Sequence, residues 1–266
     1  MRNIIILGTG RSGTSMVAAT FRSSGAFMGD HLLPATPSNP HGYYEDRELN
    51  RLNNDLIRRL FGRPLLGWRI RGKFFRTVYT VPGAFFMAAP RVLRTIQLTA
   101  NEIDRIRAFT RREPFCYKDP RFSVTLPLWM PHLPSNVGFV VVFRDPMRTT
   151  ESMIRDAREQ YEPPLPVTQT WGFTCWWRTY SRLIVLSKSS PHWMFINYDA
   201  MLDRSANADL SEFASATLDF SQIDDRTSRS QKHEWPTSSI GQRCSDLYEE
   251  LCTRASTNKP SCLRAS

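Results

Sequence analysis

The first fifteen residues constrain the fold most strongly, because a short apolar run leads directly into a glycine-rich loop. Residues 3–7 (NIIIL) form a β-branched run that is typical of a buried strand. The next eight residues, GTGRSGTS, have the spacing of the phosphate loop G-x-x-x-x-G-K-[ST], except that Thr14 replaces the lysine. Backbone N–H groups in such a loop, together with the start of a helix, bind phosphate. The segment therefore predicts a strand, a loop that binds a phosphorylated ligand, and a helix.

The loop alone leaves the type of nucleotide open. The missing lysine argues against a plain ATPase or GTPase, because that lysine neutralises the β- and γ-phosphates, although Arg11 could supply a cation. The same letters also satisfy G-x-G-x-x-G, and Asp30 lies where a dinucleotide-binding unit would carry its acidic ribose ligand. A phosphate loop, a dinucleotide site and a tight turn without a ligand are all compatible with this segment.

Strand-like and helix-like segments alternate along the rest of the chain. Further strand-like runs occur at residues 115–117, 138–143 and 193–197, and helix-compatible stretches at 14–24, 46–61, 101–110, 148–159 and 170–188. Continuous apolar runs suit strands that are buried on both faces of a parallel sheet. We therefore predict an α/β, P-loop-like three-layer fold, with a central, mainly parallel sheet flanked by helices and ligands at the carboxyl ends of the strands.

The length of 266 residues suits a single domain over residues 1–266. Residues 62–100, rich in arginine and aromatic side chains, look like an insertion or lid on the substrate side rather than a sheet element. We expect residues 220–266 to be less regular, with one last helix over 240–251. The formal charge of +10 favours anionic ligands. A nucleic-acid partner is not expected, because the basic residues are dispersed and no nucleic-acid-binding motif occurs.

Cysteine usage and hydropathy suggest the compartment. The five cysteines include no C-x-x-C pair, so we expect reduced thiols in the cytoplasm and no metal site. The sequence opens on a strand, without a charged leader and apolar stretch, so no signal peptide is expected. Its most apolar stretch, residues 74–90, is interrupted by Arg76, Pro82 and Gly83, so no membrane span is expected either.

A second group of polar residues follows the strand-like run GFVVVF. Arg144 comes directly after that run, and Ser152 follows Arg144 by eight residues on the next expected helix. A guanidinium and a hydroxyl placed there are suited to bind a second phosphate. Arg144 could equally pair with a carboxylate, and Ser152 could simply lie on a helix.

The motifs taken together resemble those of sulfotransferases that use 3′-phosphoadenosine 5′-phosphosulfate (PAPS). They comprise RSGTS after the first strand, V-V-F-R-D-P with its later serine, Tyr198-Asp199 after WMFIN, and Lys118-Asp119-Pro120 between them. The K-D-P segment is similar to that of the protein-tyrosine branch. The segment NPHGYYE, which ends at Glu45, is similar to the N-P-x-G-Y-x-E of bacterial members. The resemblance covers roughly residues 3–200.

The resemblance implies a role for each motif residue in binding PAPS and releasing 3′-phosphoadenosine 5′-phosphate (PAP), with no metal. The 5′-phosphosulfate would lie on the glycine loop, at Gly10, Arg11, Ser12, Gly13, Thr14 and Ser15. Arg144 and Ser152 would hold the 3′-phosphate, and Arg229 in the polar C-terminal stretch is a further candidate. Lys118 and Arg11 would stabilise the charge that develops on the leaving oxygen.

A hydroxyl or amine acceptor must lose a proton as it attacks, so a base is expected near it. The resemblance implies Glu45 for this role, with His31 and His41 as alternatives. Glu45 and Asp46 could instead be carboxylates that stabilise the first turn of a helix. The aromatic residues of the 62–100 segment favour an apolar or aromatic small molecule or a lipid as acceptor, with a glycan second. The acceptor and the oligomeric state are left open, with a homodimer as one alternative.

Three other functional classes compete with a sulfotransferase. They are an NAD(P)-binding Rossmann oxidoreductase, a P-loop kinase and a non-catalytic nucleotide-binding module. A second phosphate site at Arg144 and Ser152 would distinguish PAPS from ATP, which carries no 3′-phosphate.

Overall fold

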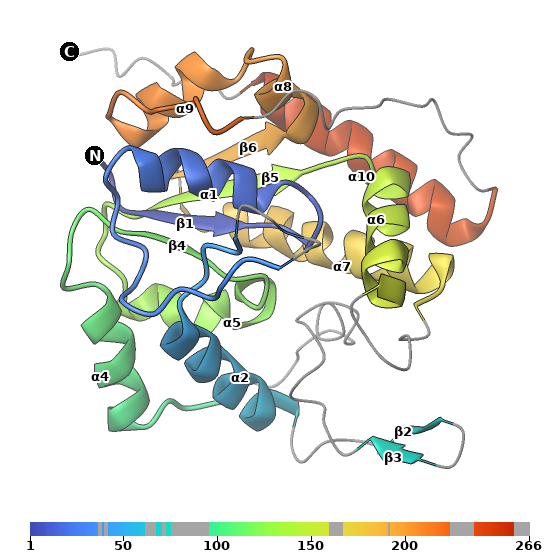
Figure 1. Cartoon of the computed structure of the whole chain (residues 1–266), viewed down its shortest axis with the longest axis horizontal. Helices are drawn as coiled ribbons and strands as arrows, with labels where there is room; N and C mark the ends of the chain where they lie inside the picture. The colour runs from blue at the N-terminus through green and yellow to red at the C-terminus, as the bar shows by residue number, and fades with distance from the viewer. Residues whose placement is uncertain are drawn as a thin grey trace.

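The computed structural model describes residues 1–36, 39, 42–61, 68–70, 73–75, 96–159, 167–190, 192–223 and 237–257, with the backbone alone at 61, 68–70 and 73–75. Its centre is a sheet of four parallel strands in the order β4-β1-β5-β6 (Figure 1). The strands are β1 (Ile4–Leu7), β4 (Cys116–Lys118), β5 (Gly138–Phe143) and β6 (Trp193–Asn197). All four lie where the apolar runs predict them, and the predicted parallel α/β sheet is confirmed.

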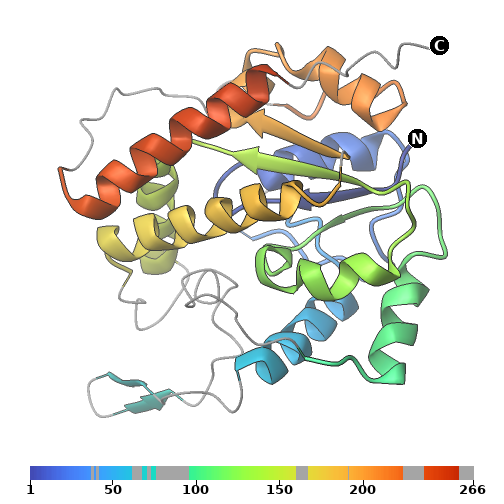
Figure 2. The same cartoon turned by 180° about the vertical axis from the view of Figure 1, so that it is seen from behind.

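Helices cover both faces of the sheet, which confirms the three-layer arrangement (Figures 1 and 2). Ile5, Leu7 and Val141 pack into the larger core with α2 (Arg47–Phe61), α5 (Phe122–Trp129), α7 (Gln169–Ser187) and α10 (Ser239–Ser256). Ile4 and Ile6 face the second core, with α1 (Thr14–Ser23), α8 (Tyr198–Leu202) and α9 (Asn207–Ala214). Successive strand residues thus enter opposite cores, which explains why the strands are apolar except at the carboxyl ends of β4 and β6, where Lys118 and Asn197 lie.

The order of the strands determines where a ligand would bind. From β1 the chain crosses to β4 on one side of the sheet and then returns to β5 on the other side. Such a switch point opens a crevice beyond the carboxyl ends of the two central strands. The glycine loop after β1 and Arg144 after β5 both lie at this edge. Gly8 allows the close approach of the two segments, because a Cβ there would lie 2.4 Å from the carbonyl oxygen of Val142.

The remaining helices are α4 (Ala100–Phe109) and α6 (Pro146–Glu159). Helix α4 begins with a capping box in which Thr99 and Glu102 each satisfy the other's backbone N–H. Predicted helix ends agree with the structure within two residues, except that α10 extends five residues beyond the predicted end. No helix in the described ranges is long and apolar enough to cross a bilayer.

Two segments add local structure to what the sequence predicts. Within residues 62–100, β2 (Trp68–Ile70) and β3 (Lys73–Phe75) form an antiparallel pair separate from the central sheet. Aromatic and β-branched residues around an Arg-Gly step are a hairpin signal that the expectation overlooked. At the C-terminal end, the predicted last helix is present as α10, whose 18 residues extend beyond the predicted range and pack against α7 and β6.

Candidate active site

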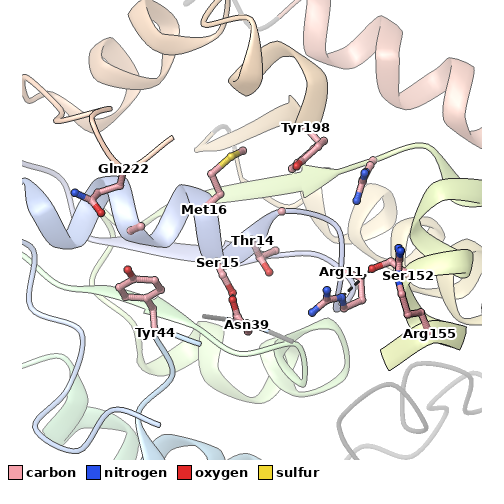
Figure 3. Close-up of a pocket in the computed structure, with 13 residues that line it drawn as sticks. Arg11, Thr14, Ser15, Met16, Asn39, Tyr44, Ser152, Arg155, Tyr198 and Gln222 are labelled. Atoms are coloured by element: carbon pink, nitrogen blue, oxygen red, sulfur yellow. Dashed lines mark hydrogen bonds between the residues drawn. The ribbon is translucent and has the colours of Figure 1, made fainter. Parts of the chain in front are cut away.

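An open pocket of about 350 Å³ lies at the carboxyl edge of the sheet (Figure 3). It combines side chains of the glycine loop and α1 with side chains that follow β5 and β6. Its lining residues are Arg11, Gly13, Thr14, Ser15, Met16, Ala19, Asn39, Tyr44, Arg144, Ser152, Arg155, Tyr198 and Gln222. Arg11, Ser152 and Arg155 lie at one end in Figure 3, and Tyr44 and Gln222 lie at the other. The first end is cationic and the second is mainly uncharged.

The first turn of α1 opens into the pocket without a side-chain cap. Its N-cap residue, Gly13, has φ 95° and donates no side-chain group, and Thr14 and Ser15 line the pocket. The first N–H groups of a helix have no intrahelical acceptor and carry a partial positive charge. Ser12 is directed elsewhere, since its buried hydroxyl donates to the Thr9 carbonyl at 2.7 Å. Neither Ser12 nor Gly10 is among the lining residues.

Arg144 is the strongest indication of an anionic ligand. Its Nε is buried and has no hydrogen-bond partner, and its guanidinium lies 4.4 Å from the centre of the Tyr198 ring. Burial lowers the pKa of Arg144, and the nearby cations Arg148 and Arg11 also lower it, while Tyr198 and Asp199 act in the opposite direction without reversing the shift. A buried, partnerless donor on a cation is unfavourable. An anion in the pocket would supply the missing acceptor and the missing negative charge.

Arg11 connects the glycine loop with helix α6. Its Nε donates to the Ser152 hydroxyl at 3.0 Å, and its Nη1 lies 3.7 Å from the Asp156 carboxylate (Figure 3). Ser152 and Asp156 are four residues apart and therefore share one face of α6. Residues predicted to hold opposite ends of one cofactor are thus brought together in a single pocket.

Helix α7 holds both anion-binding segments from behind. The buried Tyr180 hydroxyl donates to the Val142 carbonyl at 2.8 Å and accepts from the Thr9 N–H at 3.4 Å. One helical turn earlier, the Trp176 Nε1 donates to the Arg144 carbonyl at 3.0 Å. The backbone of the glycine loop and that of the β5–α6 junction are therefore fixed by neighbouring side chains of one helix.

Glu45 and Lys118 form a buried ion pair beside this pocket. Lys118 is the last residue of β4 and is paired in register with Ile6, and its Nζ lies 2.5 Å from Glu45 Oε1. The Asn50 side chain donates to Glu45 Oε2 at 3.0 Å, and Arg121 Nη1 lies 3.8 Å from the same oxygen. Tyr44 lines the pocket, whereas its neighbour Glu45 is only 6% exposed. The predicted base and the predicted cation are therefore in contact with each other.

Of the remaining predicted site residues, His31, His41 and Arg229, the structure describes only His31. The exposed His31 is absent from the lining, its backbone N–H donates to Asp46 Oδ2, and its carbonyl accepts from the Arg47 N–H. His41 and Arg229 lie outside the described residues. Asp46, by contrast, caps α2, because its Oδ1 accepts from the N–H groups of Glu48 and Leu49. The helix-stabilising interpretation thus applies to Asp46 and not to Glu45.

Asp30 does not take the place expected of a ribose ligand in a dinucleotide site. Its side chain is 68% exposed, pairs with Arg112 at 2.8 Å and does not line the pocket. In the part of the chain that the structure describes, no three potential metal-ligating side chains gather in one place.

The structure adds several pocket residues that the motifs did not identify. They are Met16, Ala19, Arg155, Tyr198 as a pocket wall, and Gln222, together with Asn39 and Tyr44, which the NPHGYYE segment contains without an assigned role. Arg155 could have been found from helical periodicity, because it lies three residues after Ser152. Gln222 has no comparable signal, because it reaches the pocket from a loop about 200 residues after α1.

Two solved sulfotransferase domains have a similar architecture. The sulfotransferase domain of the Synechococcus PCC 7002 olefin synthase matches with a TM-score of 0.54 and 14% identity, over 94% of each chain. The sulfotransferase domain from the curacin biosynthetic pathway matches with a TM-score of 0.52 and 13% identity, over 94% of this chain and 98% of that one. No family model and no curated protein sequence matches. The chain therefore has the fold of these sulfotransferase domains, as its motifs predict.

Proposed function

We propose that this protein is a PAPS-dependent sulfotransferase that moves the sulfuryl group to a hydroxyl or amine acceptor. The observation that carries the proposal is the buried, partnerless Nε of Arg144 in the pocket that also receives the uncapped N-terminus of α1. Two separate anion-binding groups in one pocket suit a nucleotide with phosphate on both its 5′ and its 3′ positions. The fold of the sulfotransferase domains agrees with this proposal.

The residues present fit such a nucleotide. Thr14, Ser15 and Arg11 would hold the 5′-phosphosulfate, and Arg144 with Ser152 would hold the 3′-phosphate. Met16, Ala19 and Tyr44 line a less polar part of the same pocket, which suits the base. When bound, PAPS supplies an activated sulfuryl group.

The chain's own groups would assist the transfer by position and charge. Sulfuryl transfer resembles phosphoryl transfer, in which positioning and electrostatic stabilisation dominate. Lys118 and Arg11 would stabilise the oxygen that leaves with PAP, and Glu45 would accept the acceptor's proton. The 2.5 Å contact between Lys118 and Glu45 supports a shared role for these two side chains.

The competing functions fit the pocket less well. A P-loop kinase needs the lysine that Thr14 replaces, and a dinucleotide enzyme needs an acidic ribose ligand, whereas Asp30 pairs with Arg112 outside the pocket. A non-catalytic nucleotide-binding module would have no use for the buried Glu45–Lys118 pair. For the acceptor we keep an apolar or aromatic small molecule or a lipid, with a glycan second, and for the compartment the cytoplasm.

A thermal-shift panel with PAP, NAD, NADP and Mg-ATP tests the donor assignment. A ligand at a hundred times its Kd stabilises the native state by roughly 2.7 kcal/mol. For a chain of this size that corresponds to an upward shift of roughly 5–10 °C. We expect this shift with PAP alone. A larger shift with NAD or Mg-ATP, or none with PAP, would overturn the proposal. A screen of acceptors with labelled PAPS would then identify the substrate class.

A further inference from the structure

Three asparagines of α2 are directed at the buried charges around Glu45. Asn50, Asn53 and Asn54 are three and four residues apart, so they share one face of the helix. Helix α2 lies beside α5, which follows the Lys118-Asp119-Pro120-Arg121 turn (Figures 1 and 2). Asn50 donates to Glu45, and Asn53 donates to Asp119 at 2.8 Å. Asn54 accepts from Arg121 at 2.8 Å. One helix therefore organises the surroundings of the predicted base.

The two oxygens of the Glu45 carboxylate have different surroundings. Oε1 lies 2.5 Å from Lys118 Nζ. Oε2 accepts from Asn50 Nδ2 at 3.0 Å and lies 3.8 Å from Arg121 Nη1. Oε1 thus contacts Lys118, the cation that we assign to stabilising the leaving oxygen. Oε2 lies against Asn50 and Arg121, which are held in place by the surrounding structure.

Arg121 is itself held in place by several contacts. Its Nη1 and its backbone N–H both donate to Asp119 Oδ1 at 2.9 Å, and its Nε is bound by Asn54. Asp119 is fixed from the other side by Asn53, whose Oδ1 accepts from Thr125 and Trp129. Among the described residues, the Lys118 ammonium contacts Glu45, whereas Arg121 is held by Asp119 and Asn54 as well, so Arg121 is not expected to move.

We propose that Asn50 and Arg121 are positioning residues that hold Oε2 of Glu45 in place. Oε1 meanwhile takes up the acceptor's proton and gives up its contact with Lys118. The inference rests on the proposed function and goes beyond it by dividing the carboxylate into a fixed oxygen and a working oxygen. Neither residue is among those that line the nucleotide pocket. Both act on the reaction through Glu45.

The charges of the cluster balance in each state. Glu45 and Asp119 are opposed by Lys118 and Arg121 before the reaction. As the acceptor oxygen bonds to sulfur, its proton passes to Oε1, the bond from sulfur to the bridging oxygen breaks, and the electron pair remains on the 5′-phosphate of PAP. Glu45 is then neutral, so Lys118 can donate to that new charge, while Arg121 and Asp119 still neutralise each other. No buried charge is left uncompensated, which would otherwise be strongly unfavourable.

Asn50 is not the residue that would make the fold most stable at this position. Its Oδ1 is buried and has no hydrogen-bond partner, although its Nδ2 is bound by Glu45. An unsatisfied buried acceptor destabilises a fold by roughly 1–3 kcal/mol. A leucine of similar volume would remove this acceptor and also the donor to Glu45. Stability and turnover are therefore expected to respond differently to the same substitution.

The first test compares Asn50→Leu and Asn50→Ala with the wild type. The probe is [³⁵S]PAPS with water as acceptor, so that release of [³⁵S]sulfate needs no knowledge of the natural substrate. We expect both variants to lose roughly ten- to hundredfold in turnover, as for a group displaced by about 1 Å. PAP affinity should be unchanged, and Asn50→Leu should unfold no earlier than the wild type. Arg51→Gln, on an exposed part of α2, is the matched control and should keep full turnover. Wild-type turnover in Asn50→Leu would overturn the proposal.

The second test does not depend on turnover. In a crystal structure of Lys118→Met, Glu45 should stay within hydrogen-bond distance of Asn50 and close to Arg121, because Oε2 keeps its partners. A Glu45 side chain that leaves them would overturn the proposal. In Lys118→Met/Arg121→Lys the shorter cation should let Glu45 shift, and an unmoved Glu45 would exclude a role for Arg121. If PAP fails to stabilise the wild type while these geometries hold, the proposed function fails, and only the fixed position of Oε2 between Asn50 and Arg121 stands.

Discussion

Arg11 Nε donates a hydrogen bond to the Ser152 hydroxyl at 3.0 Å, although the two residues are 141 positions apart. The contact joins the glycine loop after β1 with the helix after β5, and it closes one end of the pocket (Figure 3). A hydroxyl that accepts from a guanidinium still has its own proton to donate. Ser152 can therefore serve Arg11 and a bound phosphate at the same time.

Arg144→Ala should weaken PAP binding selectively. Hydrogen bonds to charged groups contribute roughly 1.5–3 kcal/mol, so we expect a loss of roughly ten- to hundredfold in affinity. Adenosine 5′-phosphosulfate, which lacks the 3′-phosphate, should bind almost as it does to the wild type. Calorimetric titration of both ligands checks this prediction, with Arg51→Ala as an exposed control. Equal losses for the two ligands would contradict the assignment of Arg144 to the 3′-phosphate.

Glu45→Gln should separate binding from chemistry. The amide keeps the shape of the side chain but cannot take up a proton, so turnover should fall by roughly two to four powers of ten. PAP affinity should be nearly intact, because Glu45 is not among the pocket lining residues. Single-turnover transfer from labelled PAPS measures the first quantity, and thermal shift measures the second. Turnover close to that of the wild type would remove Glu45 from the mechanism.

The sequence predicted best those elements whose structure depends on the pattern of their own residues. The run at residues 3–7 and the run GFVVVF became β1 and β5 because uninterrupted apolar residues suit strands that are buried on both faces. Helix α5 was not predicted, because its eight residues include Pro127, which normally ends a helix. Its burial against α2 and α7 outweighs that local preference.

The site was harder to predict because its contacts join distant segments. The loop letters identify Arg11 and the residues beside it, but they do not place its guanidinium on Ser152. The contact between Glu45 and Lys118 depends on β4 lying next to β1, and the sequence does not specify that pairing. Ser12 matches the motif, yet its hydroxyl stabilises the loop itself, because it donates to the Thr9 carbonyl at 2.7 Å.

Glu102 should make the stability of α4 dependent on pH. Burial raises the pKa of Glu102, but hydrogen bonds from Arg59 and Thr99 outweigh this effect and leave the pKa below its usual 4.5. A lowered folded-state pKa contributes stability above the unfolded pKa, and this contribution is lost as the pH falls through the folded value. Glu102→Gln should therefore destabilise the protein by about 0.5–1 kcal/mol at pH 7. The difference should shrink below pH 4.5. Urea unfolding at pH 7 and pH 3.5 measures it, and an equal difference at both pH values would exclude an electrostatic origin.

Gly13→Ala should disturb both stability and nucleotide binding. Gly13 has φ 95°, and an added Cβ would lie 2.3 Å from the Tyr198 ring, which also stacks on Arg144. The backbone strain alone is worth roughly 1–2 kcal/mol. Gly25 provides a matched control, because it has φ 91° but open space around its Cβ position, so Gly25→Ala carries the strain without the clash. We expect Gly13→Ala to unfold at a lower urea concentration than Gly25→Ala. Only Gly13→Ala should lose PAP affinity, because a displaced Tyr198 ring no longer holds the Arg144 guanidinium. Equal stability and equal PAP affinity in the two variants would show that the Tyr198 ring does not link the helix N-terminus to the 3′-phosphate site.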